Sequence, residues 1–113
     1  MRYHKEFGFP PALRIPEGIV RLWYSVHAKE RFEGKYRGFL ILPSYIKLTK
    51  DNIFEVETDD NETCNKVAAR ITYDNKKDIC IVLNPINGKV VTLWINHKND
   101  NHVITHKEKY DTP

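Results

Sequence analysis

Histidine side chains are the first candidates for chemistry in this sequence, because five of them occur within 113 residues. Three lie near the C-terminus, at His97, His102 and His106. Their spacing invites a metal ion, but no cysteine accompanies them and the chain contains no His-Glu-x-x-His motif. We therefore predict no metal site, and we expect His97 and His106 to be ordinary exposed residues.

His27 differs from these because it lies at the start of a predicted helix, two residues after Ser25, which is a good N-cap. The helix dipole disfavours a protonated imidazole at this end, so a neutral His27 would be able to accept a proton as a general base. Arg31 follows one turn later on the same helix face. The alternative is a structural histidine, and the position taken alone favours that alternative.

Apolar and turn-forming residues predict the elements that must position these side chains. Prolines and glycines predict that residues 1–18 form an extended arm, which lies on the domain or is partly disordered. A helix is predicted over 26–33, ended by Gly34. Strands are predicted from the alternation and β-branched content of residues 19–24, 53–57, 67–73, 78–83 and 89–96.

The turns between the last three strands predict how those strands pair. The Asn-Gly pair at 87–88 suits a two-residue type I′ turn, which would place Ile81 opposite Trp94. A loop centred on residues 75–76 would place Arg70 opposite Ile81. The two registers are compatible with one three-stranded meander.

These registers sort the predicted meander into two faces, because neighbours across a ladder point to the same side. The face expected to pack against the helix carries Val67, Ala69, Ile71, Cys80, Val82, Val91, Leu93 and Ile95. The opposite face carries Arg70, Thr72, Ile79, Ile81, Leu83, Thr92, Trp94 and Asn96. This face combines a cation, hydroxyls, an amide and an indole with aliphatic side chains, which predicts a shallow binding surface. The alternative is that the N-terminal arm covers this face.

Composition limits the class of protein. The length predicts a single α+β domain over 19–113 behind the arm at 1–18. The net charge of +3 is compatible with an anionic partner such as RNA but does not require one. Apolar runs fall far short of the ~18 residues of a membrane helix, and the N-terminus lacks the apolar segment of a secretory signal. We therefore expect a cytoplasmic protein without a membrane partner, whose Cys64 and Cys80 are free thiols, with Cys80 as a small buried hydrophobe.

Two motifs in the chain resemble a known superfamily. The first is the helix motif His-Ala-x-Glu-Arg at 27–31, and the second is Thr-x-Trp-x-Asn at 92–96, followed by Asp100, His102 and Tyr110. Together they are similar to phage and bacterial proteins related to the RelE, colicin D and colicin E5 nucleases. The resemblance covers residues 19–110. It implies a small α+β fold, with a short N-terminal helical part packed on a twisted antiparallel sheet, and a metal-independent endoribonuclease that needs no cofactor.

The reaction that the resemblance implies is attack of a ribose 2′-hydroxyl on the adjacent phosphate, giving a 2′,3′-cyclic phosphate and a free 5′-hydroxyl. It requires a base, an acid, and donors for the added negative charge. His27 and His102 are the implied base and acid, in either order, and Arg31 or Arg70 would hold the phosphate. The residues expected to bind the RNA by hydrogen bonds or by stacking are Arg70, Thr72, Thr92, Trp94, Asn96 and Tyr110.

The implied partners are RNA, either tRNA or mRNA, and an inhibitor or host protein if the chain is toxin-like. The alternative function is a non-catalytic phage-type module that binds RNA or a host protein through the mixed face of the meander. A third is an interaction protein that uses this face to oligomerise. Other roles remain open for single residues, since Arg31 could pair with Asp100 and Trp94 could be core beneath the arm. The nuclease hypothesis predicts that His27 and His102 flank one phosphate.

Overall fold

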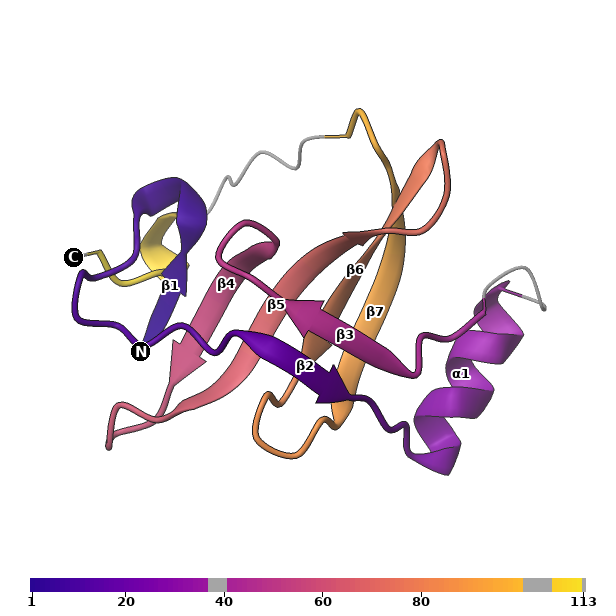
Figure 1. Ribbon diagram of the computed structural model, residues 1–113, viewed down its shortest axis with the longest axis horizontal. Helices are drawn as coiled ribbons and strands as arrows, with labels where there is room; N and C mark the ends of the chain where they lie inside the picture. The colour runs from indigo at the N-terminus through magenta and orange to yellow at the C-terminus, as the bar shows by residue number, and fades with distance from the viewer. Residues whose placement is uncertain (37–40, 101–106, 113) are drawn as a thin grey trace.

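The computed structural model describes residues 1–36, 41–100 and 107–112 and has an α+β fold. A five-stranded antiparallel sheet is crossed on one side by a two-stranded ribbon, and one helix lies at the end of the ribbon (Figure 1). The sheet has the order β1-β4-β5-β6-β7, formed by Arg2–His4, Ile53–Thr58, Cys64–Thr72, Lys77–Leu83 and Val90–His97. The ribbon pairs β2 with β3, formed by Gly18–Arg21 and Tyr45–Leu48. The helix α1 spans Val26–Tyr36, and the short 3₁₀ turns η1 and η2 span Lys5–Phe7 and Lys107–Lys109.

The edge strand β1 comes from the segment for which the sequence predicts an extended arm. Tyr3 is buried and lies opposite Val56 of β4. The C-terminal segment binds the outer side of this strand, since the Arg2 N–H donates to Asp111 Oδ2 at 2.8 Å and the Asp111 N–H donates to the Arg2 carbonyl at 2.7 Å. The two ends of the chain therefore meet at one edge of the sheet (Figure 1).

The helix α1 begins as the sequence predicts, with the Ser25 hydroxyl accepting the Ala28 N–H at 3.1 Å. Ala28 and Phe32, four residues apart, are buried in the core. The predicted end at Gly34 is wrong, because Gly34 lacks the left-handed backbone of a helix-ending glycine and the helix continues to Tyr36. No helix in the described part of the chain is long and apolar enough to cross a membrane.

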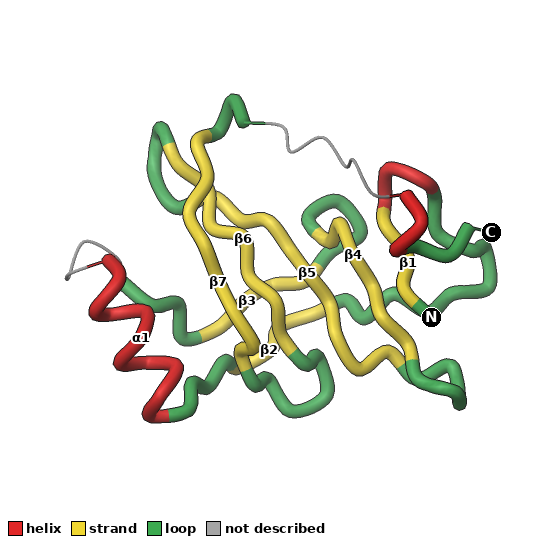
Figure 2. The backbone as a smooth tube through the Cα atoms, turned by 180° about the vertical axis from the view of Figure 1, so that it is seen from behind, coloured by secondary structure: helices red, strands yellow, loops and turns green. Residues whose placement is uncertain are grey.

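The core lies between the sheet and the ribbon. Burying one large aliphatic side chain contributes roughly 1.5–3 kcal/mol relative to leaving it exposed, so this layer provides most of the driving force for folding. The ribbon and α1 cover one side of the sheet, and Figure 2 shows the other side, where the ribbon lies behind the strands. The largest side chains that are fully buried in this layer are Ile46, Leu48, Ile53, Ile79, Ile81 and Leu83.

The pairing of β5 with β6 differs by one residue from the predicted register, because Arg70 lies opposite Cys80 and not opposite the residue after it. The loop that joins Tyr73 to Lys77 consists of residues 74–76, an odd number, whereas a loop centred on residues 75–76 contains an even number. The Lys77 carbonyl accepts the N–H groups of both Tyr73 and Asp74, at 3.0 and 3.1 Å. Because side chains alternate along a strand, a slip of one residue turns the whole strand over.

The β6–β7 loop is also longer than predicted. The Gly88 N–H donates to the Asn84 carbonyl at 2.8 Å, which forms one helical turn that Gly88, with φ of 79°, brings to an end. The predicted two-residue Asn-Gly turn is therefore wrong. A bulge at Val91 follows, since that residue has no partner opposite it, and Val90 takes the buried place expected for Val91.

Both differences have the same consequence, which is that β6 is turned over relative to the prediction. Ile79, Ile81 and Leu83 are buried in the core, whereas Cys80 and Val82 lie on the opposite side. The predicted alternation within β5 and within the rest of β7 is correct. We call the side away from the ribbon the open face, which carries Glu55, Ala68, Arg70, Thr72, Asp78, Cys80, Val82, Thr92, Trp94 and Asn96.

Candidate functional site

A cavity of about 540 Å³ opens on the open face, beside β1 and η1. Its volume is in the range of small-molecule sites and is large enough for one nucleotide unit. Three parts of the chain form its walls, namely the N-terminal strand and turn, the sheet, and the C-terminal segment. The lining residues are His4, Lys5, Asp51, Asn52, Phe54, Glu55, Arg70, Cys80, Trp94 and Tyr110.

His4 belongs to an aromatic cluster in the wall of this cavity, with its ring centre 5.3 Å from that of Tyr110 and 5.8 Å from that of Phe54. Its Nδ1 accepts the Glu6 N–H at 3.0 Å, so in the neutral ring the proton is on Nε2. Burial lowers the pKa of His4, although the Glu55 carboxylate opposes the shift. At neutral pH His4 is therefore an N–H donor.

Glu55 lies directly opposite His4 in the register of β1 and β4. Its carboxylate is 3.6 Å from the Arg2 guanidinium, and it lines the cavity together with Tyr110. Burial, and then this carboxylate, raise the pKa of Tyr110, so the phenol stays protonated at neutral pH. A carboxylate, a neutral imidazole and a phenol thus stand in one wall.

A smaller hollow of about 290 Å³ continues from the cavity along the open face. The two share Glu55 and Tyr110, so they form a single groove with these residues at its middle. Two of the cations here are paired, because Lys66 lies 3.1 Å and Arg2 lies 3.8 Å from the Glu57 carboxylate. The hollow is lined by, among others, Arg2, Glu57, Lys66, Thr92 and Lys109.

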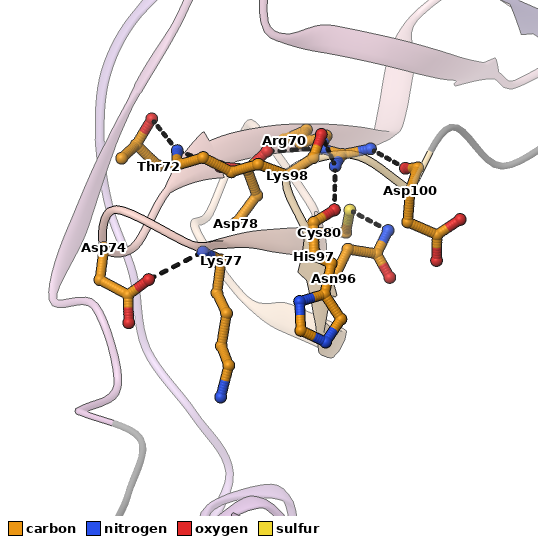
Figure 3. A network of polar contacts seen from close by, with 10 residues as sticks. All are labelled: Arg70, Thr72, Asp74, Lys77, Asp78, Cys80, Asn96, His97, Lys98 and Asp100. Carbon is orange, nitrogen blue, oxygen red and sulfur yellow. Dashed lines mark hydrogen bonds and ion pairs between the residues drawn. The ribbon is translucent and has the colours of Figure 1, made fainter.

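Arg70, which the sequence predicts as a phosphate ligand, is occupied by acceptors of the protein itself (Figure 3). Its Nε donates to the Asp78 carboxylate at 2.8 Å, and its terminal nitrogens donate to the carbonyls of His97 and Asp100, each at 2.9 Å. Lys98 binds the other Asp78 oxygen at 2.8 Å. The hydrogen bonds from Lys98 and then from Arg70 hold the pKa of Asp78 below its usual value. Arg70 therefore anchors the turn after β7 to β5.

Two further residues predicted to bind RNA also have partners in this region. Asn96 is buried, and its Nδ2 donates to the Cys80 sulfur at 3.5 Å. Burial raises the pKa of Cys80 to about 11, so this thiol is protonated and is not a nucleophile. The exposed Thr72 hydroxyl accepts a hydrogen bond from Lys98 Nζ at 3.4 Å. Among the six predicted RNA ligands, Thr92, Trp94 and Tyr110 line the groove without taking part in this network.

His27 and Arg31 lie away from the cavity. Both are exposed on α1 and line a further hollow of about 400 Å³, which shares no lining residue with the cavity and only Val91 with the smaller hollow of the groove. The Arg31 guanidinium lies 5.0 Å from the centre of the Phe32 ring. The predicted partner of His27, His102, falls at 101–106, outside the described residues.

His4, Lys5 and Glu55 were missed by the sequence analysis because no motif contains them. They meet only through the pairing of β1 with β4, which joins segments about fifty residues apart. A bulge in β4 between Ile53 and Glu55 then allows Phe54 and Glu55 both to line the cavity. The one local signal was the run Ile-Phe-Glu at 53–55, in which two apolar residues are adjacent and do not alternate with polar residues.

Comparison with known proteins gives no match for this chain. No family model, no curated protein and no solved structure matches it. In the part of the chain that the structure describes, no group of three or more histidine, cysteine or acidic side chains is arranged to hold a metal ion. The wall of the cavity, by contrast, brings together the titratable side chains of His4, Glu55 and Tyr110.

Proposed function

We propose that the groove on the open face binds single-stranded RNA and cleaves it without a metal ion, by attack of a ribose 2′-hydroxyl on the adjacent phosphate. The observation that carries this proposal is the wall that joins Glu55, Tyr110 and His4 beside Trp94. The likeness of the two sequence motifs to the RelE, colicin D and colicin E5 nucleases supports the same chemistry. We propose their sheet and helix arrangement as the finer description of this fold.

Each step of the reaction has a candidate group in the wall. Glu55 accepts the proton of the 2′-hydroxyl as its oxygen bonds to phosphorus, and Tyr110 gives its proton to the departing 5′-oxygen. Both side chains line the cavity, and a proton transfer from Glu55 to Tyr110 then restores the two groups. The His4 N–H and the Lys5 ammonium supply donors for the negative charge of the phosphorane.

The shape of the groove favours an unpaired strand. Trp94 is half-buried in the cavity and offers an aromatic surface for one base, which in a duplex would already be stacked and paired. The adjoining hollow, with Thr92 and the Lys109 ammonium, would hold a neighbouring nucleotide. This assignment moves the catalytic centre away from His27 and Arg31, while it retains Thr92, Trp94 and Tyr110 as RNA ligands.

The test is cleavage of total RNA by the purified protein in the presence of EDTA. We expect discrete fragments that end in a cyclic phosphate, and a loss of rate of about 10²- to 10⁴-fold in Glu55→Gln and in Tyr110→Phe. Glu33→Gln, which changes an exposed carboxylate on α1, is the matched control and should cleave normally. Loss of cleavage in His27→Ala with full activity in Glu55→Gln would contradict this placement.

A second candidate function is RNA binding without cleavage. It is favoured by the contacts of Arg70, because the central cation of the open face is committed to Asp78 and to backbone carbonyls. Intact RNA together with a mobility shift that weakens as salt rises would identify this function, since phosphate contacts release counterions.

A further inference from the structure

The outer side of the ribbon is a second surface, on the opposite side of the molecule from the groove (Figures 1 and 2). Ribbon side chains alternate, so Val20 and Ile46 pack inward while their neighbours point to solvent. Trp23 continues the outward row beyond β2, and Lys89 lies beside it. We call this surface the ribbon face, and its members are Ile19, Arg21, Trp23, Tyr45, Lys47 and Lys89.

Aromatic and aliphatic side chains on the ribbon face are unusually exposed. Ile19 is 73% exposed, Tyr45 is 63% exposed and Trp23 is 45% exposed. On the outward side of the paired strands, Tyr45 is opposite Arg21 and Ile19 is opposite Lys47. The surface therefore alternates rings or apolar groups with positive charges.

The cations of the ribbon face have no acidic partner among the residues that the structure describes. The ion pairs within 4.0 Å there involve Arg2, Lys66, Arg70 and Lys98, all on the open face or at its edge. Lys89 instead holds its ammonium 5.5 Å from the centre of the Trp23 ring. These positive charges are thus available to an anionic partner.

The Trp23 side chain is held in place before any partner arrives. Its Nε1 donates to the Asn87 carbonyl at 3.0 Å. Its backbone is fixed on both sides, since its N–H donates to the Gly88 carbonyl at 3.1 Å and its carbonyl accepts the Val90 N–H at 3.0 Å. A ring fixed in this way loses little conformational entropy on binding.

We propose that the ribbon face binds single-stranded RNA, with bases stacked on Tyr45 and Trp23 and phosphates held by Arg21, Lys47 and Lys89. Stacking on aromatic rings together with a row of cations is the general mode of single-strand binding, and it tolerates many sequences. A protein partner is disfavoured because the centres of protein interfaces are depleted of lysine, and Lys47 and Lys89 lie among these rings. The inference goes beyond the proposed cleavage, because it concerns a separate surface.

The binding test uses a fluorescein-labelled 2′-O-methyl oligouridylate, which lacks the attacking hydroxyl and cannot be cleaved by the proposed reaction. Binding is followed by fluorescence anisotropy at several salt concentrations. Reversing two charges in Arg21→Glu/Lys47→Glu should weaken binding at least about tenfold and should lower the logarithmic salt slope by roughly 1.4. Tyr45→Ala should weaken it between about fivefold and about 150-fold.

Matched variants separate this proposal from its rivals. Lys29→Glu/Lys76→Glu makes the same charge change at exposed sites on α1 and in the β5–β6 loop, and should bind nearly as the wild type does. Ile19→Ala removes an exposed apolar group without a ring, and should have a much smaller effect than Tyr45→Ala. If Ile19→Ala and Tyr45→Ala weakened RNA binding equally, and the protein bound phosphatidylserine vesicles, the ribbon face would be a membrane surface and the proposal would be overturned.

Because the 2′-O-methyl probe cannot be cleaved by the proposed reaction, the binding test does not depend on the proposed cleavage. Loss of binding in Trp94→Phe, with full binding in Arg21→Glu/Lys47→Glu, would place the RNA on the open face alone and overturn the ribbon proposal. Failure of the protein to cleave RNA, with the expected losses in the ribbon variants, would contradict only the catalytic proposal.

Discussion

The two exposed surfaces of this protein use their positive charges in different ways. On the open face, Arg70 and Lys98 share the carboxylate of Asp78, and each lies 2.8 Å from it. On the ribbon face, Arg21 and Lys47 stand beside an exposed ring and an exposed aliphatic side chain, with no acid within ion-pair distance among the described residues. A cation with a carboxylate and carbonyl partners holds the fold together, whereas a cation beside a ring is free to meet a ligand.

Burial explains the difference. The Asp78 side chain is only 15% exposed and that of Arg70 is 25% exposed, so each charge loses hydration and must be matched by its partner. The ribbon cations remain in water, where an ion pair would contribute little and where an unpaired charge costs little. The net charge of +3 does not distinguish these two situations.

The largest effect is expected at the contact that holds the ribbon against the β6–β7 loop. In Gly88→Ala the new Cβ would lie 1.9 Å from the Arg21 carbonyl oxygen, at a position whose φ is 79°. We expect a loss of about 3 kcal/mol in the free energy of unfolding, measured by urea denaturation. Gly34→Ala is the control, since nothing lies within 4 Å of its Cβ, and it should stabilise the helix by about 0.5–1 kcal/mol. Similar losses in both would show that Gly88 has no special role.

A smaller effect separates the two kinds of cation. Arg70→Met removes the donors to Asp78 and to the turn after β7, and should cost about 2 kcal/mol in the free energy of unfolding. Arg21→Met, which keeps a similar length on the ribbon face, should change stability by less than about 0.5 kcal/mol. Equal costs in urea titrations of the two variants would contradict the comparison.

The smallest expected effect is an acid dependence confined to the open face. The pKa of Asp78 is lowered in the folded protein, so its contribution is present above the unfolded value of about 3.9 and is lost as pH falls through the folded value. The stability difference between the wild type and Asp78→Asn should therefore shrink below about pH 4. Urea midpoints measured across this range check the prediction, and a difference that stays constant would mean that Asp78 is not held by its cations.

Local features of this chain were predictable from the sequence because neighbouring residues decide them. The Ser25 hydroxyl caps α1 by accepting a hydrogen bond from the backbone N–H of Ala28, only three residues later. Alternation along β5 correctly assigned Arg70 and Thr72 to one side of the sheet. Cys80 is the small buried residue that its apolar surroundings predict. The α+β class followed from one helix and several alternating strands, and it is confirmed.

Strand register was not predictable because it depends on loop details that composition does not specify. An odd number of residues in the loop before Lys77 and a bulge at Val91 were enough to turn β6 over. Each change costs little energy locally, but it is favoured because it buries Ile79 and Ile81 in the core.

The sequence by itself determined the helix start, the alternation within single strands and the modest net charge of +3. The tertiary structure decided which side chains meet. It placed His4 opposite Glu55, joined Arg70 to carbonyls almost thirty residues away, and left Arg21 with no acid within ion-pair distance among the residues that the structure describes. The physical reason is that helix capping and side-chain alternation act between near neighbours along the chain, whereas the partner of a charge depends on which strands pair across the sheet.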